Sequence, residues 1–208
     1  MKKVYSFMIG FLVVGLSSFT LYKTGYQVED KVNNFKLKNV DGKEVSLSDY
    51  SKSKGVIVVF TCNHCPYSKK YESRIMELDK NFKSGGWPVV AISSNDPKVE
   101  PDDSFENMQQ LAKEKGYTFP YLFDETQEVA KAFGALKTPH VFVLENKNNA
   151  FVVKYIGAID DNSDDEKAVT IKYVERAISQ LNDGANPDPS STKAIGCTIK
   201  WKKVEAKN

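Results

Sequence analysis

The sequence predicts an α/β fold in which a mixed central sheet is flanked by helices. Three observations predict it: apolar β-branched runs of strand length, helical apolar spacing between them, and two late strand-like runs joined by a short polar turn. Early strand–helix alternation followed by a closing hairpin and a helix gives such a sheet. The 208 residues, 41% hydrophobic and 27% charged, suffice for one soluble domain with appendages.

The first strand–helix unit is the clearest. The run "GVIVVF" at 55–60 is continuously apolar, which is typical of a strand buried on both faces. The following helix is indicated by apolar residues at helical spacing, Tyr71, Ile75, Leu78 and Phe82, and "SGGW" ends it. A second buried strand, "PVVAIS", occupies 88–93.

The middle of the chain adds two helices around a short extended piece. Asp103 and Glu106 stand at capping-box spacing before a helix that ends at Gly116. "TFPYLFD" is extended, and Asp124 with Gln127 predicts the start of a short helix.

The last part of the predicted domain consists of two strands and a helix. Strands are expected at 140–145 and 151–157, followed by a helix with the apolar stripe Tyr173, Val174, Ala177, Ile178 and Leu181. We therefore expect a domain over 26–182 and a tail, rich in turn-forming residues, that packs on it over 183–208.

Residues 1–25 are predicted to be a signal peptide or a membrane anchor. Lys2 and Lys3 precede an apolar run from Val4 to Tyr22, which has the features of a secretory signal and nearly the length of a membrane span. Both alternatives stay open. Either predicts export, to the periplasm or to the extracytoplasmic face of the membrane, where thiol chemistry matters.

Charge and cysteine content exclude other classes. The net charge is +2, from 29 basic and 27 acidic residues, which gives no nucleic-acid footprint. Three cysteines are too few for a disulfide framework.

The segment "TCNHCPY" at 61–67 carries the predicted chemistry. If the helix begins around Cys62, the helix N-terminus should lower the pKa of that thiol. Cys62 would then attack a disulfide, and Cys65, one turn on, would resolve the mixed disulfide. His64 either favours the thiolate, which makes the pair more oxidising than one with Gly-Pro between the cysteines, or is a spacer that points to water.

Two other interpretations of the pair are weaker. A structural zinc site needs a second ligand pair, and only Cys197, His64 and His140 remain, without suitable spacing, so no metal and no cofactor is expected. A permanent disulfide closing so short a loop would stabilise little.

Together the motifs resemble a known family. "FTCNHCPY", "SNDP", "DSFENM", "DETQEVAKAFGALKTPHVF", "GAIDDN" and "GCTIKW" are similar to the thioredoxin superfamily and, within it, to the peroxiredoxin-related, AhpC/TSA-like redoxins. The likeness runs from about Tyr26 to Trp201. It implies a thioredoxin-like fold in which Thr138 and a cis Pro139 face the cysteines and the substrate. His140 is expected to be structural.

The sequence also departs from that family. Thr61 stands where thioredoxins carry Trp, so Thr61 and His64 are the residues expected to modulate the pair. The strand at 55–60 lacks the buried acid of thioredoxins. Counted back from Cys65, the peroxiredoxin signature P-x-x-x-T-x-x-C meets Cys62 and Val58 instead of Thr and Pro, which puts a peroxidase activity in doubt.

Cys197 and an acidic run are two further features of the sequence that need an interpretation. Cys197 could be a third, resolving thiol, pair with another chain, or be an inert buried residue; the lack of an adjoining activating group favours the inert reading. The run "DDNSDDE" at 160–166 lacks the Gly and Glu of a calcium loop and is expected to cap the last helix.

The sequence thus predicts an exported thiol–disulfide oxidoreductase. It would act on protein or small-molecule disulfides, with a redox partner that resets Cys62 and Cys65, a possible tether to the membrane, and no nucleic acid. The alternatives are a thiol-dependent peroxidase and a non-enzymatic binding module with a structural disulfide.

Overall fold

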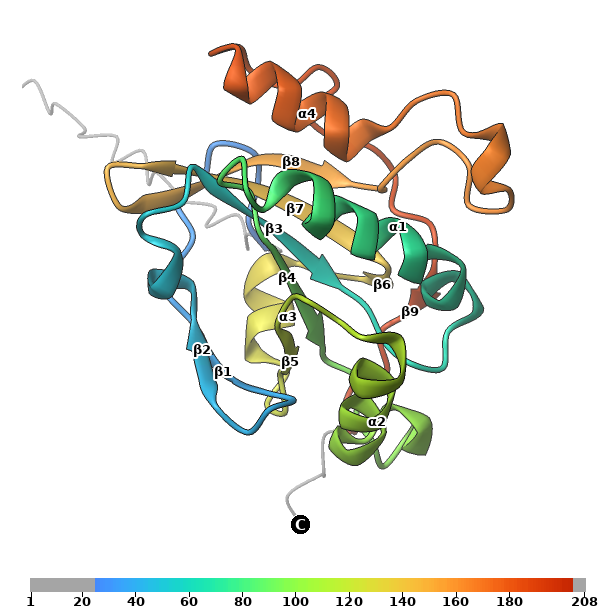
Figure 1. The fold of residues 1–208 in the computed structure, drawn as a ribbon. Helices are drawn as coiled ribbons and strands as arrows, with labels where there is room; N and C mark the ends of the chain where they lie inside the picture. The colour runs from blue at the N-terminus through green and yellow to red at the C-terminus, as the bar shows by residue number, and fades with distance from the viewer. Residues whose placement is uncertain (1–24, 204–208) are drawn as a thin grey trace, which may run out of the picture.

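A seven-stranded mixed sheet forms the centre of the protein in the computed structural model, which describes residues 25–203 (Figure 1). Its order is β2-β1-β5-β4-β3-β7-β8, and a separate pair is formed by β6 and β9. The strands are β1 (Lys36–Asn39), β2 (Glu44–Ser46), β3 (Gly55–Phe60), β4 (Val89–Ser93), β5 (Tyr121–Phe123), β6 (Lys137–Thr138), β7 (His140–Lys147), β8 (Ala150–Gly157) and β9 (Cys197–Thr198).

Four α-helices cover the sheet within the described residues. They are α1 (Pro66–Phe82), α2 (Phe105–Lys115), α3 (Glu128–Phe133) and α4 (Tyr173–Asn182), with short 3-10 turns at Leu47–Tyr50, Pro101–Asp103 and Glu166–Ala168. Between residues 25 and 203, no helix is long and apolar enough to cross a membrane. The predicted signal or anchor segment lies outside the described residues, Gly25 excepted.

The central strand β3 explains the mixed character of the sheet. It runs parallel to β4 and antiparallel to β7, and all six of its residues are buried. A strand that is paired on both sides and buried on both faces has a continuously apolar sequence. The expected fold class, a mixed sheet flanked by helices, is confirmed.

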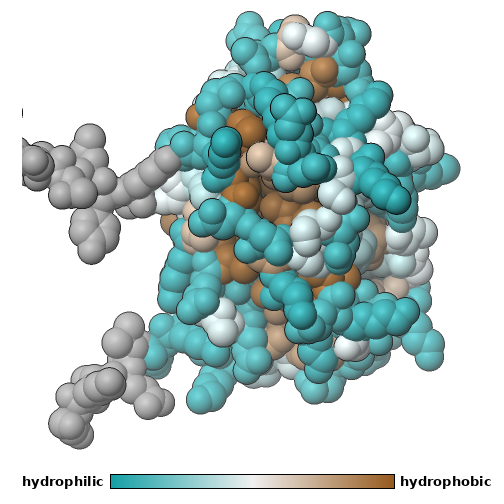
Figure 2. Space-filling view, turned by 90° about the vertical axis from the view of Figure 1, so that its left-hand side faces the viewer, coloured by the Kyte–Doolittle hydropathy of each residue, from teal (hydrophilic) through white to brown (hydrophobic). Residues whose placement is uncertain are grey.

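Alternate residues of β3 enter two separate hydrophobic clusters. Ile57 and Val59 pack in the cluster that contains the apolar faces of α1, α2 and α4. Val56, Val58 and Phe60 pack in the other cluster, with α3. Figure 2, a view from the left-hand side of Figure 1, shows hydrophobic residues gathered in the middle of that face and hydrophilic residues around them.

Local details differ from the sequence-based expectation at the acidic run and at the first two strands. The acidic run does not cap α4, whose N-cap is Lys172; instead the carboxylate of Asp160 binds Arg74 Nη1 at 2.8 and 2.9 Å. Strands β1 and β2 were not predicted, because their short, half-exposed sequences carry little apolar signal.

Candidate active site

The cysteine segment is the junction between β3 and α1. The strand ends at Phe60, and the helix begins at Pro66 with Cys65 as its N-cap. Proline at the first helical position needs no N–H partner, which sets the start of the helix there. The expectation that the helix begins around Cys62 is therefore wrong. Cys62 lies in the preceding loop and is 3% exposed, while Cys65 is fully buried.

Thr138 contacts the sulfur atoms of both Cys62 and Cys65. Its hydroxyl lies 3.3 Å from Cys62 Sγ, and its carbonyl oxygen lies 3.3 Å from Cys65 Sγ. The peptide bond from Thr138 to Pro139 is cis, as the family resemblance implied. The structure thus brings Cys62, Cys65, Thr138 and Pro139 together from two distant parts of the chain.

The structure also adds the third cysteine to this cluster. Cys65 is disulfide-bonded to Cys197, with 6.1 Å between their Cα atoms, and Cys62 is a free thiol. Cys197 belongs to β9, which pairs with β6 so that Cys197 lies opposite Thr138. The preference for an inert Cys197 is therefore wrong. The sequence could not reveal the bond because the two residues are 132 positions apart.

A buried carboxylate organises the loop around Cys62. One oxygen of Asp103 accepts the backbone N–H groups of Asn63 at 2.6 Å and His64 at 3.1 Å. The other accepts a hydrogen bond from Asn95 Nδ2 at 2.6 Å and lies 2.5 Å from His64 Nδ1. His64 thus faces Asp103 instead of water, and its Nε2 lies 3.5 Å from a carboxylate oxygen of Glu100.

These surroundings raise the pKa of the Cys62 thiol while Cys65 is bonded to Cys197. Burial raises the pKa of Cys62, and the negative charge of Asp103 raises it further. Hydrogen bonds from Thr138, from Ser68 and from the backbone of Cys65 oppose that rise without cancelling it. The sequence-based expectation of a lowered pKa is wrong for this form, because the thiol precedes the helix and lies beside a carboxylate.

The remaining predicted residues have different surroundings. Thr61 is buried, and its backbone N–H donates to Ile92 O of β4 at 2.9 Å. His140 is 8% exposed, packs against Phe142, and burial lowers its pKa to about 4. Its Nδ1 accepts the N–H of Leu136 at 3.4 Å, so a neutral, structural histidine fits this position.

Cys62, His64 and Asp103 could in principle hold a metal ion, since one donor atom of each lies within 4.8 Å of the others. Asp103, however, is already engaged by donors from Asn63, His64 and Asn95. A structural zinc site also needs four ligands. We therefore assign the triplet to hydrogen bonding.

Sequence reasoning missed Asp103 as a site residue. Its spacing to Glu106 favoured a helix cap, yet the N-cap of α2 is Ser104, whose hydroxyl accepts the N–H of Asn107. A better capping residue directly after Asp103 was the available signal, because Ser at the N-cap frees the preceding acid for another partner.

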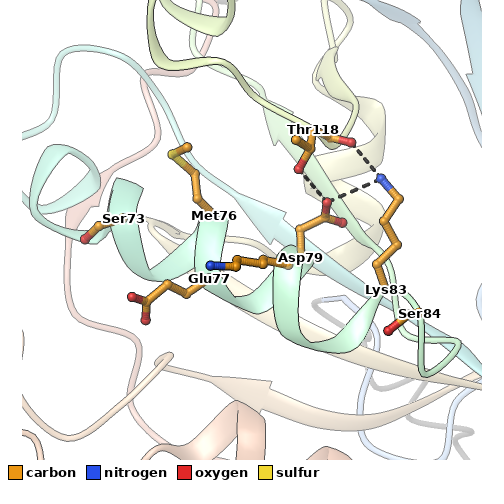
Figure 3. Close-up of a pocket in the computed structure, with 8 residues that line it drawn as sticks. Ser73, Met76, Glu77, Asp79, Lys83, Ser84 and Thr118 are labelled. Carbon is orange, nitrogen blue, oxygen red and sulfur yellow. Dashed lines mark hydrogen bonds and ion pairs between the residues drawn. The ribbon is translucent and has the colours of Figure 1, made fainter.

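A surface hollow lies away from this cluster. It has a volume of about 640 Å³ and is lined mainly by the outer face of α1, with Thr118 on the facing loop (Figure 3). Lys83 Nζ bridges Asp79 and the carbonyl of Thr118 across one end. None of the three cysteines lines it, so its size gives no reason to place the chemistry there.

The fold and the site together define a thioredoxin-like protein with a cysteine pair at the first β–α junction and a cis-proline loop opposite. In agreement, the structure of a thioredoxin domain of a thiol-disulfide oxidoreductase from Bacteroides vulgatus superposes with a TM-score of 0.51 at 18% identity, covering 64% of this chain and 91% of that one. The chain belongs to the AhpC/TSA family, whose sequence model matches residues 28–161.

Two further relatives are similar over most of the chain. The thiol-disulfide oxidoreductase ResA of Bacillus thuringiensis is 25% identical over 154 residues, which are 70% of this chain and 84% of that protein. An uncharacterized conserved protein from Geobacillus kaustophilus is 37% identical, with a TM-score of 0.79 over 86% of this chain and 94% of that one.

Proposed function

We propose that this protein is a thiol–disulfide oxidoreductase in which Cys62 and Cys65 are the reacting cysteines. The observation that carries the proposal is the convergence of both sulfur atoms on Thr138, directly before the cis Pro139. The similarity to ResA supports the same reaction class. Protein or small-molecule disulfides are the substrates, and a separate redox partner resets the pair.

The chemistry follows from thiol–disulfide exchange. The Cys62 thiol loses its proton and attacks one sulfur of a substrate disulfide, which releases the other substrate sulfur as a thiolate. Cys65 then attacks Cys62 Sγ, which forms the Cys62–Cys65 disulfide and releases the reduced substrate. Cys65 must be reduced for this second step, so the Cys65–Cys197 disulfide has to open first.

Apolar side chains beside the site suit a protein substrate. Leu136, directly before β6, is 62% exposed, and Ile195, two residues before Cys197, is 41% exposed. Single exposed apolar residues are common on protein surfaces. Two of them, each two residues away in the chain from Thr138 or Cys197, would contact apolar side chains of a bound peptide.

Insulin reduction tests the proposal. The protein should accelerate the precipitation of insulin by dithiothreitol, and Cys62→Ser and Cys65→Ser should return the rate to that of dithiothreitol alone. Ser84→Ala, an exposed change beyond the far end of α1, is the control and should behave as wild type. Wild-type activity in Cys62→Ser would overturn the assignment.

The same preparations separate the alternatives. A peroxidase would consume hydrogen peroxide with dithiothreitol as reductant, and the absence of the peroxiredoxin signature predicts that this rate is low. A non-enzymatic module would be inactive in both assays, and dithiothreitol would barely reduce its disulfide.

We further propose that the protein acts outside the cytoplasm. Lys2 and Lys3 followed by the apolar run Val4–Tyr22 support export, through either a cleaved signal or an anchor that tethers the domain to the membrane. Fractionation of cells that make the full chain should find it outside the cytoplasm. The mass of the recovered protein would distinguish cleavage from anchoring.

A further inference from the structure

Cys197 is held at the site by more than its disulfide. After β9, the side chain of Ile199 is 3% exposed and packs in the cluster that contains α3. The backbone N–H of Lys200 donates to Asn95 Oδ1 at 2.8 Å, and its carbonyl accepts from Asp96 N and Gln127 Nε2. These contacts do not depend on the sulfur–sulfur bond, so the strand stays in place when the bond opens.

The approach of the strand to the cis-proline loop is unusually close. A Cβ atom on Gly196 would lie 2.2 Å from the carbonyl oxygen of Thr138, far inside any real contact. Glycine is therefore required at the position before Cys197. This glycine lets the tail pack against β6, with Cys197 opposite Thr138.

All three cysteines meet at Thr138, but they differ in access to solvent. Thr138 contacts Cys62 through its hydroxyl and Cys65 through its carbonyl, and its backbone pairs with that of Cys197. Cys62 and Cys65 are buried, whereas Cys197 is partly exposed. Access is one of the factors that set the rate at which a sulfur exchanges. Cys197 is therefore the sulfur of this disulfide that an external thiol reaches most easily.

We propose that Cys197 is a third redox cysteine and that Cys65 alternates between two partners, Cys197 and Cys62. The inference rests on the proposed function, since it takes Cys62 and Cys65 to be redox-active, and it adds an outer cysteine that connects the buried pair with solvent.

The exchange within the protein is balanced. The Cys62 thiolate attacks Cys65 Sγ, the Cys62–Cys65 bond forms, the Cys65–Cys197 bond breaks, and Cys197 leaves as a thiolate. The proton lost by Cys62 is matched by one gained by Cys197. One disulfide is present before and after, so no external oxidant or reductant takes part.

The step with a partner is balanced in the same way. A thiolate of a partner dithiol attacks Cys197 Sγ and releases Cys65 as a thiolate. The second thiol of the partner then attacks the mixed disulfide, which frees Cys197. The partner becomes a disulfide, and the protein gains the two electrons and two protons.

Disulfide mapping tests the exchange without any enzyme assay. The oxidised full chain is treated with iodoacetamide without reductant and digested with trypsin. Cys62 and Cys65 then lie in the peptide 55–69, and Cys197 lies in the peptide 194–200. We expect two populations: the two peptides cross-linked through Cys65 with Cys62 alkylated, and peptide 55–69 bridged internally with Cys197 alkylated.

Cysteine variants test which disulfide gives each population. Cys62→Ser should contain only the cross-linked form, and Cys197→Ser only the internal bridge. Cys197→Ser should also be reduced by glutathione about tenfold more slowly than wild type, because its remaining disulfide is buried. Lys203→Ala, an exposed tail change, is the matched control and should be reduced at the wild-type rate.

The outcomes distinguish a failure of the inference from a failure of the proposed function. The inference is overturned, even if insulin is reduced, when only one disulfide is found in the wild-type protein. In that case either Cys197, in peptide 194–200, is always a free thiol, or only Cys62 is ever alkylated. Two populations in a protein that does not reduce insulin would support the inference and overturn the proposed function.

Discussion

Two buried carboxylates near α1 show how differently one residue type can be used. Asp160 is 4% exposed and faces the guanidinium of Arg74, with the hydroxyl of Tyr71 donating to it at 2.9 Å. Asp103 is fully buried, and its partners are two backbone N–H groups, an amide and a histidine. The first charge is neutralised by a permanent cation, whereas the second still acts on Cys62.

The partners of each carboxylate indicate whether it serves stability or chemistry. A buried ion pair needs both partners, because either charge alone would be desolvated without compensation. A carboxylate with no Arg or Lys side chain against it can raise the pKa of a thiol beside it. We therefore expect Asp160 to matter for folding and Asp103 to matter for the reactivity of Cys62.

Asp160→Asn should have the largest effect on stability. It leaves the buried Arg74 guanidinium without its counter-charge, which should lower the free energy of unfolding by about 3–5 kcal/mol. Urea denaturation measures the loss. Asp164→Asn is the matched control: it breaks the exposed ion pair with Lys70 and should cost less than about 1 kcal/mol. A loss for Asp160→Asn as small as that of the control would show that the pair is not structural.

His140 extends the comparison to a buried group whose pKa is shifted by burial. Burial lowers its pKa to about 4, against an ordinary value of 6.5, so the unfolded chain binds a proton at this residue between those pH values and the folded protein does not. The stability contribution is complete above pH 6.5 and is lost as the pH falls to about 4. It corresponds to about 3 kcal/mol.

His140→Asn tests that contribution because it keeps an acceptor but cannot titrate. Denaturation at several pH values should show a smaller loss of stability between neutral pH and pH 4 in the variant than in wild type, by about 3 kcal/mol. Parallel curves for the two proteins would mean that His140 does not titrate between these pH values.

Gly196→Ala tests the close contact between the tail and Thr138. The added Cβ meets the carbonyl of Thr138, so β9 must move, at a cost of about 1–3 kcal/mol. The fraction of protein with the Cys65–Cys197 bond, measured by mass spectrometry, should fall. Gly85→Ala is the control, since its Cβ would lie 3.3 Å from Phe82 O and could be accommodated by a small shift. An unchanged fraction would contradict the close approach.

Asp103→Asn should have the smallest effect on stability and a clear effect on the thiol. The side-chain oxygen of the new Asn can still accept the N–H groups of Asn63 and His64, whereas its amide nitrogen cannot accept from Asn95 Nδ2, so the expected loss is about 1–2 kcal/mol. Removing the negative charge should lower the pKa of Cys62, so alkylation of Cys62 at neutral pH should become several-fold faster. Asp102→Asn, an exposed neighbour, is the control. Slower or unchanged alkylation would show that burial alone sets the pKa.

Features that are encoded by neighbouring residues could be predicted from the sequence. The apolar run of β3, the helical spacing of α1 and the position of the cysteines between them follow from the order of neighbouring residues. The cis bond before Pro139 was reached through family resemblance, on a motif that is equally local. These features could be predicted because period and turn chemistry act over a few residues.

Which distant residues meet at the site depends on the tertiary fold. Cys197 joins Cys65 because a glycine lets the tail lie against β6, and Asp103 reaches the cysteine loop because Ser104 takes over the capping of α2. Both outcomes depend on contacts between residues far apart in the chain. Their energies come from packing and burial in three dimensions, which no local pattern of residues contains.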